Sequence, residues 1–191
     1  DHSKDNTKKV IEEFIKKYNN TKGIFHEINE GRGKTVTDGI KNARGKIVGF
    51  IDVDLEVQPH YIFPLVKSIT EGNDISTAYR KYLINENISY YRWIAHKGYR
   101  FLSRLLLKTK LKDTETGCKF FRKEKILPIL EEIKDNYWFW DTEIMVRSYY
   151  KGFKIEEIPS IFIRNPSSKS TVKFFSDTKK YFINIIKFRK E

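Results

Sequence analysis

One short segment limits the fold more than any other, because it is a run of apolar residues that ends abruptly in acidic ones. Residues 47–53 read IVGFIDV, and Asp52 and Asp54 fall where the run gives way to polar sequence. A strand that is apolar on both sides is typical of a sheet covered on both faces, as in parallel α/β sheets. We therefore expect a central strand whose carboxyl end carries carboxylates.

Alternating signals for helices and strands extend this expectation along the chain. The expected helices cover residues 7–20, 34–43, a segment that begins at Pro59, 124–133 and 141–150, and the expected strands cover 24–28, 47–53, 75–79, 118–122 and 155–163. This order predicts an α/β fold with a mainly parallel sheet flanked by helices. Crossover units normally open with a strand, whereas this chain opens in a loop and a helix, so we expect at least one N-terminal strand to be missing.

The composition indicates one packed domain with an anionic partner. The chain has 37 Lys and Arg against 25 Asp and Glu, a net charge of +12 over 191 residues. This sign favours nucleic acid, a phosphorylated substrate or an acidic membrane. No apolar run approaches the ~20 residues that cross a bilayer, so no spanning segment is expected. Cys118, the single cysteine, is predicted to be a small strand residue and not a nucleophile.

The carboxylates after the central strand are candidate ligands of a divalent cation. In open α/β sheets, ligands bind beyond the carboxyl ends of the strands. Asp52 and Asp54 can converge on one cation there, and Glu56 can add a ligand or a contact behind them. Oxygen ligands suit Mg²⁺ or Mn²⁺, which keep waters and bridge substrate phosphates. The alternative for an isolated Asp-x-Asp is that it caps a turn.

Basic side chains at other predicted strand ends would surround such a cation. They are Arg80, Lys119, Arg122, Arg164 and Lys169. A guanidinium can hold two phosphate oxygens at once, and a lysine supplies a point charge. Each residue alone is more simply a solvated surface charge, but their shared position favours phosphate binding.

Five segments resemble those of one known family. They are DHSKDNT, NEGRGKTVTDGIKNARGKIVGFIDVDLE, STAYRKY, DTETGCKFFRKE and FWDTEIMVRSYYKGFKIEEIPSIFIRNPSSKST. The chain from Asp1 to Lys169 thereby resembles the family-two glycosyltransferases of the GT-A fold, and within them the dolichyl-phosphate mannose synthase and polyprenyl-phosphate hexosyltransferase group. The second segment resembles the family's glycine and lysine loop, helix and metal-binding strand. Cys118 and Lys119 replace the Phe and Arg of its Asp-x-x-Ser/Thr-Gly-Phe-Arg motif, and the family's first strand has no counterpart.

The resemblance implies an inverting transfer of a hexose from a nucleotide diphosphate sugar, of the GDP-mannose or UDP-glucose type, to dolichyl or polyprenyl phosphate. Mg²⁺ or Mn²⁺ would be the cofactor, held by Asp52 and Asp54. The implied substrate-binding residues are Asp1, Lys34, Arg80, Lys119, Arg164, Ser168 and Lys169.

The chemistry of such a transfer explains why no nucleophile and base pair is evident. Negative charge gathers on the departing diphosphate, and nearby cations stabilise it. A phosphate acceptor is already anionic near neutral pH, so a strong general base is unnecessary. Asp113, Asp141 and Glu143 are then candidate catalytic helpers that orient basic groups or an acceptor hydroxyl, and surface or capping acids are the alternative.

Two basic, aromatic and leucine-rich segments predict contact with an anionic membrane. They cover residues 88–110 and 172–191, and basic amphipathic helices of this kind lie in the headgroup layer. Packing of their apolar residues into the core is the alternative. We expect residues 1–171 to form an N-terminally incomplete catalytic domain, followed by a C-terminal amphipathic helix. The expected location is peripheral, at the cytoplasmic face of the membrane.

Two other functions are compatible with these features. One is a glycosyltransferase that acts on a sugar hydroxyl in polysaccharide or glycolipid synthesis, which would need a working general base. The other is a non-catalytic basic module that binds RNA or membrane. Residues 88–110 read as a continuous helix and no RNA-binding motif is present, so no nucleic-acid partner is expected.

Overall fold

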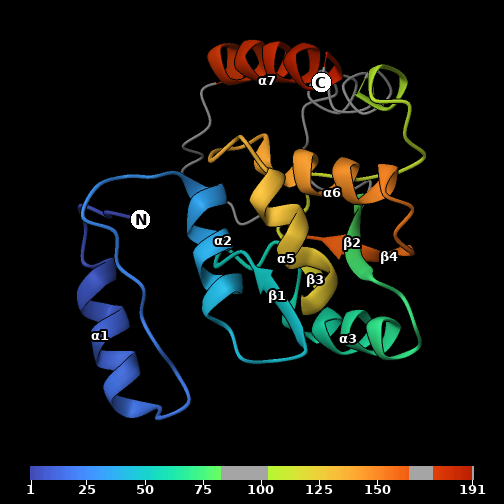
Figure 1. Cartoon of the computed structure of the whole chain (residues 1–191). Coiled ribbons are helices and arrows are strands. Elements are labelled where there is room, and N and C mark those ends of the chain that lie inside the picture. The colour runs from blue at the N-terminus through green and yellow to red at the C-terminus, as the bar shows by residue number, and fades with distance from the viewer. Residues whose placement is uncertain (83–102, 164–173, 191) are drawn as a thin grey trace.

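The computed structural model describes residues 1–82, 103–163 and 174–190. Its helices are α1 (Thr7–Lys17), α2 (Arg32–Asn42), the 3-10 turn η1 (Pro59–Tyr61), α3 (Ile62–Thr70), α5 (Lys123–Glu132), α6 (Trp140–Tyr150) and α7 (Phe174–Arg189). Its strands are β1 (Ile47–Ile51), β2 (Ile75–Tyr82), β3 (Cys118–Arg122) and β4 (Ile155–Phe162) (Figure 1). Residues 103–106 are also helical.

The four strands form one sheet in the order β1-β3-β2-β4. β3 is antiparallel to both of its neighbours, and β2 is parallel to β4. Three strands therefore run in one direction and β3 alone runs against them, so the expected α/β fold with a mainly parallel sheet is confirmed, with one reversed strand. Ile51 pairs with Cys118 in this register, which brings the start of β3 to the end of β1.

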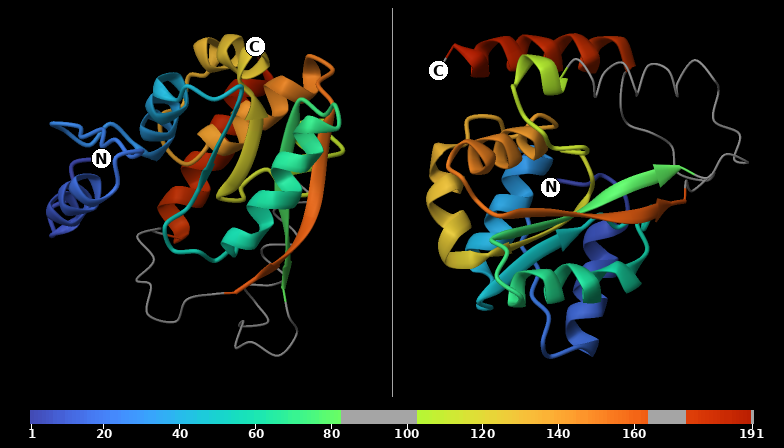
Figure 2. Two further views of the ribbon diagram at one scale, coloured as in Figure 1. Left: turned by 90° about the horizontal axis from the view of Figure 1, so that it is seen from below. Right: turned by 90° about the vertical axis from the view of Figure 1, so that its right-hand side faces the viewer.

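Helices cover both faces of the sheet, as the apolar character of β1 predicts. On one face, α2, α5 and α6 enclose a core that includes Val48, Phe121 and Trp140. On the other face, α3 contributes Leu65 to a smaller cluster with Ala78 and Cys118. Figure 2 shows α3 and α6 on opposite sides of the strands. The end of β1 is thus held from both sides.

Most predicted elements are present with shifted ends. The predicted helix 7–20 ends at Lys17, and β2 continues to Tyr82 instead of ending at residue 79. Gly72 and Gly152 each follow the end of a helix, and both have positive φ angles, of 109° and 76°. Glycine adopts this backbone conformation without the steric cost that other residues meet.

The N-terminal region departs from the prediction. Residues 24–28 form no strand, because none of the described strands pairs with them. α1 buries none of its residues, and Val10, Phe14 and Tyr18 are exposed although they share one helical face. Figure 1 shows α1 to one side of the sheet and its covering helices. The periodic pattern predicted the helix correctly, but burial requires a partner surface.

The C-terminal helix packs on the rest of the molecule through an aromatic cluster. Tyr181, Ile185 and Phe188 of α7 pack with Phe139 and Val146. α7 lies above α6 in the orientation of Figure 1, and Figure 2 shows the same order from another side. No helix among residues 1–82, 103–163 and 174–190 is long and apolar enough to cross a membrane. Residues 88–102 and the predicted domain boundary at 171 lie outside the described residues.

Candidate active site

Asp52 lies directly after β1, where its side chain crosses the start of β3. Its backbone N–H donates to the carbonyl of Gly117 at 2.8 Å. A Cβ on Gly117 would overlap the Oδ2 atom of Asp52, so this position accepts only glycine while Asp52 keeps its place. Burial raises the pKa of Asp52, and the attraction of Arg32 offsets that effect only in part. The reversed direction of β3 creates this contact.

Arg32 begins α2 and joins two of the predicted catalytic acids. Its Nη2 atom donates to Asp52 Oδ1 at 2.7 Å, and its Nη1 atom donates to Asp141 Oδ2. The guanidinium also lies 5.3 Å from the centre of the Phe50 ring. Burial alone would lower the pKa of Arg32, but Asp141 and Asp52 together raise it. Arg32 therefore stays charged beside the end of β1.

Lys119 continues this line of alternating charges into the core. Its ammonium donates to Asp141 Oδ1 at 2.6 Å and to the carbonyl of Thr116, and the side chain is fully buried. Burial lowers the pKa of Lys119, while the neighbouring Asp141 opposes that shift. Placing charged groups in the interior is costly, and such groups gather at functional sites. Asp141 thus has a cation at each of its oxygens.

Arg80 and Asp113 form a second pair of predicted site residues. Arg80 Nε donates to Asp113 Oδ2 at 2.7 Å and Nη2 donates to Oδ1 at 2.8 Å, which is a bidentate contact. The backbone N–H of Asp113 in turn donates to Glu157 at 2.8 Å. Burial raises the pKa of Glu157. The structure brings the two residues together, with Asp113 holding the Arg80 side chain.

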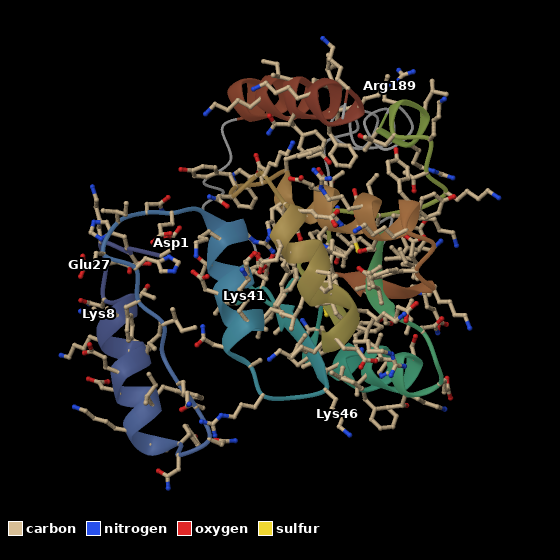
Figure 3. All side chains as sticks on the ribbon, in the orientation of Figure 1. Asp1, Lys8, Glu27, Lys41, Lys46 and Arg189 are labelled. Atoms are coloured by element: carbon tan, nitrogen blue, oxygen red, sulfur yellow. The ribbon has the colours of Figure 1, made fainter. Side chains whose placement is uncertain are left out.

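Asp1 closes the loop that leads into α2. Its carboxylate accepts the backbone N–H groups of Glu30 at 2.8 Å and Gly31 at 2.9 Å. His26 Nδ1 lies 3.0 Å from the same carboxylate. Asp1 belongs to a different segment from this loop, yet Figure 3 shows it close to α2, whereas Lys8 lies farther out. The N-terminal segment is therefore tied to the start of α2.

Lys34 turns away from the carboxylates that Arg32 holds. Its ammonium donates to Asp38, one turn further along α2, at 2.6 Å. That hydrogen bond is the main reason why the pKa of Lys34 is raised. The predicted role of Lys34 in substrate binding stays a prediction.

Asp54 and Glu56 form the turn that follows Asp52. Asp54 is exposed, and its Oδ1 atom accepts the backbone N–H of Glu56 at 3.1 Å. Within the described part of the chain, no three His, Cys, Asp or Glu side chains converge on one point where a metal would sit. The metal-binding roles of these residues stay predictions.

Glu143 supports the neighbouring backbone and side chains. It accepts the N–H groups of Lys134 at 3.1 Å and Asp135 at 3.0 Å, and it pairs with Arg147 at 2.7 Å. These contacts tie the loop before α6 to the first turn of that helix. The predicted catalytic role of Glu143 stays a prediction, and its partners are those of a residue that braces the loop.

The remaining residues that the sequence singles out are Arg164, Ser168, Lys169, Arg122 and Cys118. Arg164, Ser168 and Lys169 lie outside the described residues. Arg122 lies at the opposite end of the reversed β3, where it donates to the carbonyl of Ile69 at 3.0 Å. Cys118 is buried in β3, and burial raises the pKa of its thiol to about 11, so the prediction of a small strand residue is confirmed.

A pocket of about 410 Å³ opens between the start of α2, the end of β1 and the loop before α6. It is lined by Asp1, Asn29, Gly31, Arg32, Thr35, Val36, Phe50, Ile51, Asp52, Val53, Tyr137 and Trp138. Its volume falls in the ordinary range of small-molecule sites. Acidic, basic and aromatic side chains therefore meet in one hollow. Arg32 lines this pocket together with Asp52, although no sequence motif pointed to Arg32 as a site residue.

Comparison with known proteins identifies the family of the chain. The family model described as Glycosyl transferase family 2 matches residues 1–129. The chain belongs to glycosyl transferase family 2.

Three relatives match this chain over part of their own length. Glycosyltransferase AglD of Haloferax volcanii is 31% identical over 133 residues, which are 68% of this chain and 21% of AglD. The dolichyl-phosphate beta-glucosyltransferase of Homo sapiens is 28% identical, over 83% of this chain and 52% of the relative. That of Saccharomyces cerevisiae is 27% identical, over 83% of this chain and 54% of the relative. The chain therefore spans about half the length of the latter two and a fifth of the first.

Solved structures share the fold at low sequence identity. Glucosyl-3-phosphoglycerate synthase from Mycobacterium tuberculosis, in complex with Mn²⁺, UDP and glucosyl-3-phosphoglycerate, matches with a TM-score of 0.65 and 15% identity. The match covers 86% of this chain and 56% of that one. A structure described as a mycobacterial protein matches with a TM-score of 0.68 and 14% identity, over 98% of this chain and 61% of the other. The expected GT-A fold is thereby confirmed.

Proposed function

We propose that the protein is an inverting, metal-dependent hexosyltransferase that moves a hexose from a nucleotide diphosphate sugar to dolichyl or polyprenyl phosphate at a membrane surface. The position of Asp52 carries this proposal, because it lies at the end of β1, on the wall of the pocket and next to the Arg32 guanidinium. The relatives from human and yeast bear the name dolichyl-phosphate beta-glucosyltransferase, which supports a lipid phosphate acceptor and a glucose donor.

The chemistry of the acidic turn fits a hard divalent cation. Asp52 and Asp54 are two carboxylates on one turn, and both are at least partly accessible. The proposed ligands of Mg²⁺ or Mn²⁺ are these two residues, with Glu56 beside them, and waters and the diphosphate would complete the shell. A bound cation supplies Lewis-acid stabilisation of the diphosphate charge. A related fold in complex with Mn²⁺ and UDP supports this assignment.

The cationic residues of the site have different proposed tasks. Arg32 reaches the pocket, so its guanidinium is placed to meet negative charge on a diphosphate. Lys119 is fully buried and reaches Asp141, not the pocket, which supports a positioning role. Arg80 is held by Asp113, so the proposed phosphate contact comes from a preorganised side chain. Asp1, Lys34, Arg164, Ser168 and Lys169 remain proposed substrate contacts.

The partners of Asp141 favour a phosphate acceptor over a sugar hydroxyl. Both oxygens of Asp141 accept charge-assisted hydrogen bonds, one from Arg32 and one from Lys119. The carboxylate of Asp141 therefore holds two cations in place. Transfer to a hydroxyl needs a separate proton acceptor, whereas a phosphate monoester is already ionised near neutral pH.

Contact with an anionic membrane, at its cytoplasmic face, is part of the same proposal. On α7, Tyr181 and Ile185 face the core, while Ile183 and Ile186 are exposed. Lys187 and Lys190 are exposed at the end of the helix, and the whole chain carries a net charge of +12. An apolar and basic surface of this kind suits a headgroup layer.

The decisive experiment replaces both acids of the turn. The Asp52→Asn, Asp54→Asn double variant should lose transfer from UDP-glucose to a polyprenyl phosphate in the presence of Mn²⁺ while its circular dichroism stays unchanged. A control with the same change of charge, Glu12→Gln with Glu13→Gln, alters two exposed acids of α1 and should keep full activity. Full transfer by the first variant would remove the acidic turn from the mechanism. A parallel assay with GDP-mannose distinguishes the donors.

A further inference from the structure

The loop between α5 and α6 carries two aromatic side chains that the core does not use. In the sequence Tyr137-Trp138-Phe139-Trp140, the last two residues are buried in two different clusters. The first two remain 55% and 45% exposed, and both line the pocket. Large aromatic side chains that stay exposed in a pocket indicate a surface for ligand contact, because burying them in the core would be favourable.

This loop is held in place by hydrogen bonds on both sides. Asp135 Oδ1 accepts the N–H of Tyr137 at 2.8 Å and that of Trp140 at 3.2 Å, and Asp135 Oδ2 accepts from Asn184 of α7 at 2.9 Å. The carbonyl of Asn136 accepts the N–H of Lys34 at 3.2 Å. These hydrogen bonds fix the loop in a conformation that leaves both rings exposed. A ring that is already held in place loses little conformational entropy when it binds a ligand.

Trp138 lines the pocket beside Arg32. The Arg32 guanidinium lies 6.0 Å from the centre of the Trp138 ring, and the same guanidinium contacts Asp52 and Asp141. Tyr137 lies next to Gly31, whose N–H binds Asp1. Trp138 is therefore near the guanidinium that holds two acids, and Tyr137 is near the backbone that binds Asp1.

We propose that Trp138 is the platform on which the transferred hexose of the donor rests, an inference that depends on the proposed function. A hexose presents a face of C–H groups that packs on an aromatic ring, while its hydroxyls stay free for hydrogen bonds. The indole next to Arg32 would fix the ring plane of the sugar relative to the diphosphate. The base of the nucleotide would lie away from Trp138, toward Asp1, which also lines the pocket.

Binding measurements separate the sugar from the nucleotide. Isothermal titration calorimetry with Mn²⁺ gives the affinities for UDP and UDP-glucose, and for GDP and GDP-mannose as a second pair. Trp138→Ala should weaken binding of the nucleotide sugar roughly tenfold and change binding of the free nucleoside diphosphate less than about twofold. Trp138→Phe, which keeps an aromatic face, should recover most of the loss. Phe63→Ala removes an exposed ring of α3 that does not line the pocket and should change neither affinity.

The possible outcomes bear on different claims. Equal weakening of nucleotide and nucleotide sugar would assign Trp138 to the nucleotide and overturn the inference. Unchanged affinities in Trp138→Ala would overturn it as well. If the unsubstituted protein bound neither nucleoside diphosphate, the proposed function would fail, and this inference would fail with it.

Discussion

Asp52 is a single residue whose surroundings disfavour its charge. Burial raises its pKa above the ordinary value, and the nearby Asp141 adds to that shift, whereas Arg32 opposes it. A raised pKa in the folded state means that the protonated form is the better fit to the fold. The contribution of Asp52 to stability is therefore fully present below the unfolded pKa and is lost as the pH rises through the folded pKa.

We expect Asp52→Asn to separate stability from function. At pH 7 the variant should unfold at the same or a higher urea concentration than the unsubstituted protein, because an uncharged amide avoids the cost of ionisation. At about pH 4 the two midpoints should converge as Asp52 takes up its proton. Urea titrations followed by circular dichroism check this. If Asp52→Asn were instead less stable than the parent at pH 7, and this difference shrank at acidic pH, the Arg32 contact would outweigh the cost of burial.

Patterns of single residues in the sequence predict some residues of the site and miss others. Asp52 was identified because an apolar strand ends at it, and that signal is local. Arg32 was missed in favour of Lys34, although both belong to one helix. Residues two positions apart on a helix point about 200° away from each other, so only one can face the site. The sequence does not say which, because that depends on how α2 packs against β1.

At the scale of elements, α2 depends on two glycines in opposite ways. A Cβ on Gly33 would overlap the buried ring of Trp140, so this glycine permits the close approach of α2 to the start of α6. A Cβ on Gly39 would meet no atom within 4 Å. The segment 24–28 illustrates the complementary limit: its composition favours a strand, but a strand exists only where another strand pairs with it.

These glycines give a matched pair of substitutions in one helix. Gly33→Ala should lower the free energy of unfolding by roughly 1–3 kcal/mol, because the new methyl group displaces Trp140. Gly39→Ala should raise it by up to about 1 kcal/mol, since alanine is the better helix former at an open position. Chemical denaturation of both variants measures the difference. Equal effects would mean that α2 does not pack on Trp140 as described.

At the scale of the whole molecule, α7 forms a layer whose surroundings the sequence does not determine. For residues 172–191 the sequence leaves membrane contact and core packing open. Core packing is confirmed for one face of α7, and membrane contact stays a prediction for the other. Tyr181 and Phe188 pack inward, and the T-shaped contact of Phe139 with Tyr181 at 5.1 Å anchors the helix. Ile183 and Ile186 remain outside. Helical periodicity predicts two faces, but not which surface each one meets.

The outward face should determine binding to anionic vesicles. Lys187→Glu with Lys190→Glu should weaken sedimentation with phosphatidylserine vesicles at least about tenfold, because each basic residue near such a surface contributes about 1 kcal/mol. Lys9→Glu with Lys16→Glu makes the same change of charge on exposed positions of α1 and should have a smaller effect. Equal losses in both variants would mean that overall charge, and not α7, attracts the protein to lipid.

The pairing of Ile51 with Cys118 has a consequence for how this sheet tolerates insertions. Side chains along a strand alternate between its two faces, so Lys119 points toward Asp141 and Phe120 points toward the opposite layer. A slip of one residue between the two strands would exchange them, leaving a phenyl ring beneath the acids and an ammonium among apolar side chains. One inserted residue between Asp113 and Gly117 would be enough to allow that slip. The same insertion in a loop at the far edge of the sheet would leave the charges beneath the acids in place.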